Sequence, residues 1–191
     1  LVAWVGLLAL VLAGVGCKHE EKNTAPQATT ERSPELTKAL RRAQLRAERR
    51  PRDLQAQLEA GKLCYEQGFY NDAYQAYLRA LGVEPQNLEA MVGMARTNLK
   101  LQNPTQGLDW VGRARRVKPD DTDLVELEAR LFLLSGQMDQ AIAGFRRATS
   151  LSPGEATTWL NLASAYAVTR QYAQAAAAAQ KAVALAPNSA V

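Results

Sequence analysis

The segment Leu63–Asn87, LCYEQGFYNDAYQAYLRALGVEPQN, holds two helix-like stretches on either side of a glycine and ends shortly after a proline. That proline belongs to a series with a constant interval of 34 residues: Pro51, Pro85, Pro119, Pro153 and Pro187. A fixed period of about 20–50 residues indicates a repeat architecture. Because proline lacks a backbone N–H and clashes with the preceding turn, each one is predicted to mark the end of a helix pair.

When the segments that end at these prolines are aligned with one another, three further positions agree with the period, because they hold only glycine or alanine. We call each set of equivalent positions a column. They lie 24, 12 and 5 residues before each proline from Pro85 onward. Helices approach closely only where side chains are small, so these columns predict three lines of contact between helices. The columns are Gly61, Ala95, Ala129 and Ala163; Ala73, Gly107, Ala141 and Ala175; and Ala80, Ala114, Ala148 and Ala182.

Larger side chains occupy the columns 8 and 21 residues before the prolines, including Tyr77, Phe145 and Tyr166. With these columns, residues 54–187 resemble the tetratricopeptide repeat family, most fully in TTWLNLASAYAVTRQYAQAAAAAQKAVALAP (157–187). The resemblance implies an all-α fold, a right-handed α-solenoid of antiparallel helix pairs. We predict four repeats within residues 53–191: 54–87, 88–121, 122–155 and 156–191.

Turn and capping residues recur with the same period. Gly68 and Gly136 are expected in the turn within a helix pair, where a left-handed backbone suits glycine. Small polar residues are expected to cap both kinds of helix. Asp53, Asn87 and Asp121 are assigned to the first helices, and Asn71, Thr105 and Asp139 to the second helices. The glycines of the second repeat, Gly93, Gly107 and Gly112, are expected to loosen its helices.

The first 16 residues, LVAWVGLLALVLAGVG, carry no charge and are followed by Cys17. They fit a secretory signal, a transmembrane helix, which needs about 20 residues, or a lipoprotein signal. LAGVGC (12–17) resembles the bacterial lipobox, although Gly14 stands where leucine is usual. We favour a lipoprotein-type signal at residues 1–17 with lipidation at Cys17, followed by a polar, flexible tether at residues 18–34.

A basic helix is predicted at residues 35–52, where it would cap the end of the repeat array. Its apolar face holds Leu36, Leu40, Ala43 and Ala47. The opposite face is basic and is either solvated or in contact with anionic lipid near the anchor. That face holds Lys38, Arg42, Arg46 and Arg49.

The sequence contains no arrangement of residues typical of catalysis. It has no phosphate-binding glycine loop, nucleophile elbow or pair of catalytic carboxylates. Two cysteines and one histidine do not make a zinc site, and Cys64 lies in a core column where a buried structural thiol is expected. The net charge of +4 comes largely from residues 38–52, so it does not indicate nucleic acid. We therefore predict a protein that is not an enzyme, with no cofactor, no metal and no nucleic-acid partner.

In the family that the chain resembles, the first helix of each pair lines a groove that binds protein or peptide partners. Lys62, Arg96 and Arg130 form one column of these helices. Apolar and basic neighbours complete the predicted groove: Tyr65, Leu99, Lys100 and Leu133. Such a surface suits a partner segment with acidic and apolar residues. The asparagines of the family's carboxylate clamp are missing, with only Asn161 in a comparable place, so recognition of a peptide C-terminus is not predicted.

Proteins that join a lipobox to these repeats include outer-membrane lipoproteins that help to assemble pilus secretins and other envelope machines. The resemblance thus implies an interaction scaffold, anchored by lipid to the bacterial envelope and facing the periplasm or the cell exterior. Lys18 after Cys17, rather than aspartate, favours the outer membrane. Two alternatives are an inner-membrane, signal-anchored repeat domain of a maturation pathway and the repeat portion of a larger enzyme.

Overall fold

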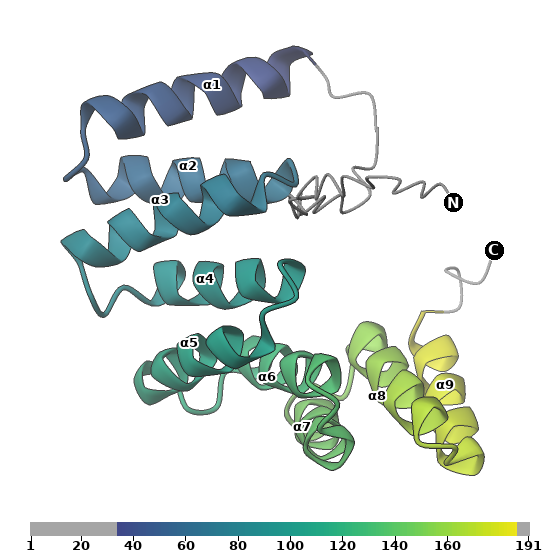
Figure 1. The fold of residues 1–191 in the computed structure, drawn as a ribbon. Coiled ribbons are helices and arrows are strands. Elements are labelled where there is room, and N and C mark those ends of the chain that lie inside the picture. Colours follow the sequence, from purple (N-terminus) through teal and green to yellow (C-terminus); the bar gives the residue numbers. More distant parts are fainter. Residues whose placement is uncertain (1–33, 187–191) are drawn as a thin grey trace, which may run out of the picture. The chain divides into compact units, whose positions relative to one another are not determined.

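The computed structural model describes residues 34–186, and within them the chain forms nine α-helices and no strand (Figure 1). The all-α prediction is confirmed. None of the helices between residues 34 and 186 is long and apolar enough to cross a membrane. The helices are α1 (Pro34–Arg49), α2 (Leu54–Glu66), α3 (Tyr70–Val83), α4 (Leu88–Lys100), α5 (Pro104–Val117), α6 (Thr122–Leu134), α7 (Met138–Leu151), α8 (Ala156–Val168) and α9 (Tyr172–Leu185).

Helices α2 to α9 form four pairs that keep the 34-residue period of the sequence. Each first helix has 13 residues and each second helix has 14. Each second helix through α7 ends two residues before its proline, as predicted for Pro85, Pro119 and Pro153. The two helices of each pair pack against each other, and each of the first three pairs packs against the next one along the chain, which is the packing of a solenoid.

Helix α1 occupies the place that a second helix would take in a preceding pair. It ends at Arg49, two residues before Pro51, as the other second helices do. Its buried residues Ala43 and Ala47 lie 34 residues before Tyr77 and Leu81, which are buried in α3. Ala43 and Ala47 pack with alanines of α2, and the Gln57 side chain donates a hydrogen bond to the Ala47 carbonyl at 2.8 Å. This helix therefore covers the first described pair.

The three small columns lie at the contacts between helices. All members are buried except Ala175, which is half-buried because no helix follows α9 in residues 34–186. Gly144 adds a further close approach, since a Cβ atom there would lie 2.8 Å from the Cβ of Ala129. Short side chains at these positions let the helix backbones come together.

Two glycines of the second repeat serve packing, so the expectation that they loosen the helices is wrong. The Tyr77 ring of α3 lies between Gly61 of α2 and Gly93 of α4. A Cβ atom would come within 2.8 Å of the ring at Gly61 and 2.4 Å at Gly93. A Cβ atom at Gly107 would likewise lie 2.5 Å from the Leu131 side chain. Only Gly112 among the three faces open space.

The capping predictions are confirmed for the first helices and wrong for the second ones. The side chains of Asp53, Asn87 and Asp121 accept hydrogen bonds from the backbone N–H groups of Ala56, Ala90 and Leu124 at 3.0, 3.0 and 3.2 Å. Three-residue turns connect the helices of each pair, so the second helices begin before the polar residues. Asn71, Thr105 and Asp139 therefore lie inside the first turn, and no side chain caps these helices.

The turns within the pairs share one left-handed residue. Gly68 and Gly136 take φ values of 80° and 77°, which confirms the prediction for both glycines. Gln102 and Arg170, at the equivalent positions, take φ values of 60°. In each turn the next backbone N–H bonds to a carbonyl five residues earlier, as in Phe69 to Cys64 and Asn103 to Asn98. This Schellman-type closure holds the left-handed backbone even where the residue is not glycine.

Candidate functional site: the first-helix surface

Lys62, Arg96 and Arg130 lie at equivalent positions of α2, α4 and α6, and all three side chains are exposed. Helix α2 packs against α4, and α4 packs against α6, so the same face of the three helices forms one surface. We call this the first-helix surface. It also holds Lys100, which is exposed, and Leu99 and Leu133, which are half-buried.

The electrostatic surroundings of Tyr65 on α2 include the cations of the next two first helices. Its ring contacts the ring of Tyr70, with 5.6 Å between centroids and 60° between planes. Burial raises the pKa of the Tyr65 hydroxyl, Tyr70 raises it further, and the positive charges of Arg96 and Arg130 lower it. Guanidinium groups from the next two first helices thus act on a side chain of α2, which is expected of cations on one continuous surface.

The cations of the first-helix surface are only partly neutralised. Arg96 pairs with Asp123 at 3.8 Å, and both side chains are largely exposed, at 49% and 80%. Such exposed pairs contribute about 0–1 kcal/mol. Lys62, Arg130 and Lys100 form no ion pair within residues 34–186. The surface therefore presents cations that ion pairs neutralise only in part, beside half-buried apolar side chains.

Asn161, the asparagine in the place comparable to a clamp residue, takes part in contacts between two first helices. Its side-chain amide donates to Glu126 of α6 at 2.8 Å. The Thr158 hydroxyl donates to the other oxygen of the same carboxylate, also at 2.8 Å. Sequence reasoning missed Glu126, because its role depends on two residues of the next repeat.

The predicted basic face lies on α1, where Lys38, Arg42, Arg46 and Arg49 are all exposed. Arg46 is bound to α2 through Glu59 at 3.2 Å and pairs with Asp53 at 3.7 Å. The other three form no ion pair in the described part of the chain. Cys17, the predicted lipidation site, lies outside the described residues.

No reactive group stands out among residues 34–186. Cys64 is a free thiol that is 1% exposed, and burial raises its pKa, although the Gln44 amide donates to its sulfur at 3.6 Å. A raised pKa disfavours the reactive thiolate at neutral pH. In the same part of the chain no cluster of histidine, cysteine and acidic side chains is placed to hold a metal ion.

Paired helices with a constant period and an exposed first-helix face define a repeat scaffold of the kind that binds proteins. Two sequence profiles described as tetratricopeptide repeat match residues 65–131 and 126–190. The chain belongs to the tetratricopeptide repeat family.

Solved structures of other repeat proteins share this fold. MamA residues 41 to the end from Desulfovibrio magneticus RS-1 superposes with a TM-score of 0.74 at 18% identity, covering 83% of this chain and 89% of that one. YrrB, described as a TPR protein with an unusual peptide-binding site, gives a TM-score of 0.67 at 23% identity, with 81% and 79% covered. The human protein O-mannosyl-transferase TMTC1 is 24% identical over 68% of this chain, which spans 19% of that protein's length.

Proposed function

We propose that this chain is a non-catalytic scaffold that binds an acidic, partly apolar segment of a protein partner on the first-helix surface. The tetratricopeptide fold supports a protein or peptide partner. The observation that carries the finer proposal is the column of exposed cations on α2, α4 and α6 beside Tyr65, Leu99 and Leu133. Carboxylates of the partner would pair with Lys62 and Arg130. Apolar side chains of the partner would cover the half-buried side chains of Tyr65, Leu99 and Leu133.

A simpler role exists for the same residues. Long basic side chains can shield apolar surface with their methylene stems while their charged ends stay in water. In that case the cations would contribute nothing to partner binding. The two roles differ in what removing the three charges does to affinity.

The test uses Lys62→Ala, Arg96→Ala and Arg130→Ala together. A photo-crosslinking residue at Leu99 first captures the partner, and the partner segment is then titrated against both proteins. We expect the triple variant to bind at least about tenfold more weakly, because charges desolvated under a partner cost about 2–5 kcal/mol when truncated. The melting temperature should stay unchanged, since all three side chains are exposed.

The matched control removes three exposed cations elsewhere: Arg41→Ala, Arg52→Ala and Arg116→Ala. It changes the net charge equally and should bind as the unaltered protein does. Equal weakening in both triple variants would mean that only overall charge matters. Undiminished binding by the first triple variant would place the interface elsewhere.

We further propose that Cys17 carries a lipid and anchors the scaffold to the bacterial envelope, where it supports assembly of a machine such as a pilus or secretion system. The support is the sequence LAGVGC and the polar stretch after it. The protein would face the periplasm or the exterior, with the outer membrane favoured. Lys38, Arg42 and Arg49 could then contact anionic lipid beside the anchor.

The anchor is tested by growing cells with a fatty-acid probe and separating membranes. The full chain should take up the label and sediment with membranes, and Cys17→Ser should lose both properties, because the probe is attached through that sulfur. Cys64→Ala should keep the label. An unlabelled protein that stays membrane-bound would favour the signal-anchored inner-membrane alternative.

The third alternative is that these repeats belong to a larger enzyme. The match to part of the O-mannosyl-transferase TMTC1 is the observation that favours it. The gene sequence on both sides of the encoded chain would decide, since an adjoining catalytic domain is required for this alternative.

A further inference from the structure

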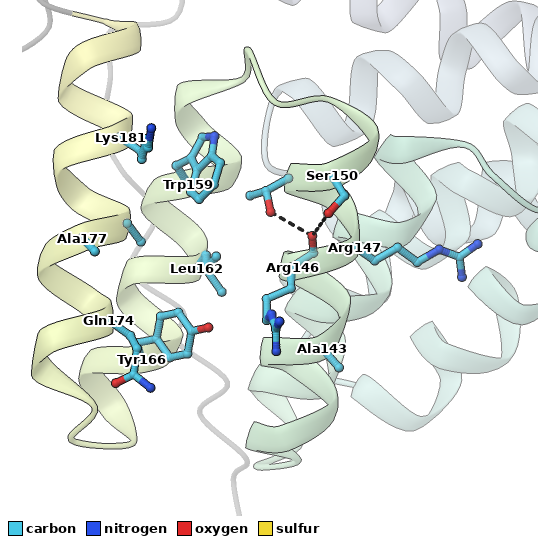
Figure 2. A pocket seen from close by; sticks show the side chains of 12 residues that line it. Ala143, Arg146, Arg147, Ser150, Trp159, Leu162, Tyr166, Gln174, Ala177 and Lys181 are labelled. Atoms are coloured by element: carbon cyan, nitrogen blue, oxygen red, sulfur yellow. Dashed lines mark hydrogen bonds between the residues drawn. The ribbon is translucent and has the colours of Figure 1, made fainter.

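A cavity of about 660 Å³ opens among the last three described helices (Figure 2). Trp159, Leu162 and Tyr166 of α8 form its apolar part, and the Leu162 and Tyr166 side chains point toward α7. Helix α7 contributes Arg146 and Thr149, and α9 contributes Ala178 and Lys181. Cavities of about 300–1,000 Å³ are the size that binds small ligands or a few side chains of a partner.

The internal repeats show how the side chains of this junction differ from those of an earlier junction. Thr149 is equivalent to Leu81 two repeats earlier, and Ala178 is equivalent to Trp110. At that earlier junction Leu81 is 7% exposed, and Trp110 packs against the same core cluster. At the third junction the two second-helix side chains are thus short, and the large side chains stand on the first helix, where Trp159 and Tyr166 replace Met91 and Asn98.

The intermediate junction, formed by α5, α6 and α7, is filled by a different kind of contact. Arg115 is equivalent to Thr149, and it forms an ion pair with Glu128 of α6. Both side chains are mostly buried, at 25% and 22% exposed. Leu162 replaces Glu128 at the third junction, so neither member of the pair is present there.

The rim of the cavity carries uncompensated positive charge. Arg146 and Lys181 are exposed, and neither forms an ion pair in the described part of the chain. Arg147, by contrast, is bound to Asp120 at 2.6 Å. The Trp159 indole N–H donates to the Pro153 carbonyl at 3.0 Å, which holds the ring in place at the cavity.

This cavity is separate from the first-helix surface. Ser164 is the α8 residue equivalent to Lys62, Arg96 and Arg130. At about 100° per residue, Leu162 and Tyr166 lie roughly on the opposite side of α8 from Ser164. A ligand in the cavity would therefore leave the first-helix surface open.

We propose that the cavity is a second binding site, which takes a partner segment with one bulky aromatic or aliphatic side chain flanked by carboxylates. The side chain would fill the space that Trp110 occupies at the earlier junction and would contact Trp159 and Tyr166. Carboxylates on either side would meet Arg146 of α7 and Lys181 of α9. The scaffold could then hold two segments on two different faces.

The test uses two blocked, fluorescently labelled peptides, Ac-Glu-Glu-Phe-Leu-Glu-Glu-amide and its counterpart with lysine in place of glutamate. An acidic, apolar peptide also suits the first-helix surface, so fluorescence anisotropy is measured with the full chain carrying Lys62→Ala, Arg96→Ala and Arg130→Ala, and the further substitutions are made in this triple variant. The glutamate peptide should bind at least about tenfold more tightly than the lysine peptide, because only its charges match the rim. Arg146→Ala with Lys181→Ala should weaken its binding by about tenfold.

Ala178→Trp supplies the side chain that the earlier junction already carries, so it should fill the cavity and abolish binding while the protein stays folded. Its far-ultraviolet circular dichroism and its melting temperature check the fold. If Ala178→Trp unfolds the chain, the exposed pair Arg146→Ala and Lys181→Ala still decides the matter. The unaltered chain is measured beside the triple variant, and any tighter binding by the unaltered chain is assigned to the first-helix surface.

Three outcomes would overturn the proposal. The first is no binding of the glutamate peptide at millimolar concentration. The second is equal binding of both peptides. The third is binding by the triple variant that survives both the cavity-filling and the charge-removing substitutions.

Discussion

Truncation of Phe145 to alanine is expected to lower the free energy of unfolding by about 3–5 kcal/mol, as for other large core side chains. The Phe145 ring of α7 is fully buried. It packs with Ala129 of α6 and with Leu162 of α8, so it joins the third pair of helices to the fourth. Removing the Phe145 ring would leave a cavity between α7 and its neighbours α6 and α8.

Urea unfolding measures the loss, and amide hydrogen exchange locates it. In repeat proteins stability is close to a sum of repeat and neighbour-interface contributions, so exchange should rise most in α8 and α9. Leu160→Ala is the matched control, because Leu160 of α8 is 52% exposed and its truncation should change stability by no more than about 0.5 kcal/mol. A loss below about 1 kcal/mol for Phe145→Ala would contradict its place in the core.

Gly93→Ala is expected to cost about 3 kcal/mol, at the upper end for an added methyl group in a packed core. The new Cβ atom would lie 2.4 Å from the Tyr77 ring, and this ring is buried and also lies close to Gly61, so it has little room to move away. Thermal and urea unfolding measure the change. Gly112→Ala is the control: this helical glycine faces open space, so alanine should stabilise by about 0.5–1 kcal/mol.

A double variant tests the stated cause. One repeat later, the equivalents of Tyr77 and Gly93 are Val111 and Leu127, both buried. There the second-helix residue is the smaller Val111 in place of Tyr77, and the first-helix residue is the larger Leu127 in place of Gly93. Tyr77→Val should therefore reduce the cost of Gly93→Ala, so the two changes should not add. Strict additivity would show that contact with the ring is not the cause.

Much of the fold could be predicted because it depends on spacing. The prolines and the small columns predicted the pairs, and Asp53, Asn87 and Asp121 predicted the caps of the first helices. Where prediction failed, a nearby contact was decisive. Asn71 looks like a cap in sequence, but a three-residue turn starts α3 before it. Gly93 looks like a helix breaker, but it makes room for Tyr77.

The candidate sites likewise contain a part that the sequence period predicts and a part that depends on contacts between repeats. The column Lys62, Arg96 and Arg130 could be predicted from the period alone. Its electrostatic neighbours could not, because Arg96 pairs with Asp123 of the following first helix. The bond from Asn161 to Glu126 joins residues 35 positions apart, and nothing in either local sequence signals it.

The amino-acid sequence by itself determined the repeat length, the pairing of helices and the faces that carry apolar or basic residues, because these follow from periodic spacing and the helical turn. The tertiary structure alone decided the left-handed turns at Gln102 and Arg170, where closing hydrogen bonds outweigh a residue preference. It also decided that a cavity opens at α7, α8 and α9. Whether a junction is filled depends on the summed volumes and charges of side chains from three helices, such as Thr149, Leu162 and Ala178, and no single stretch of sequence holds that sum.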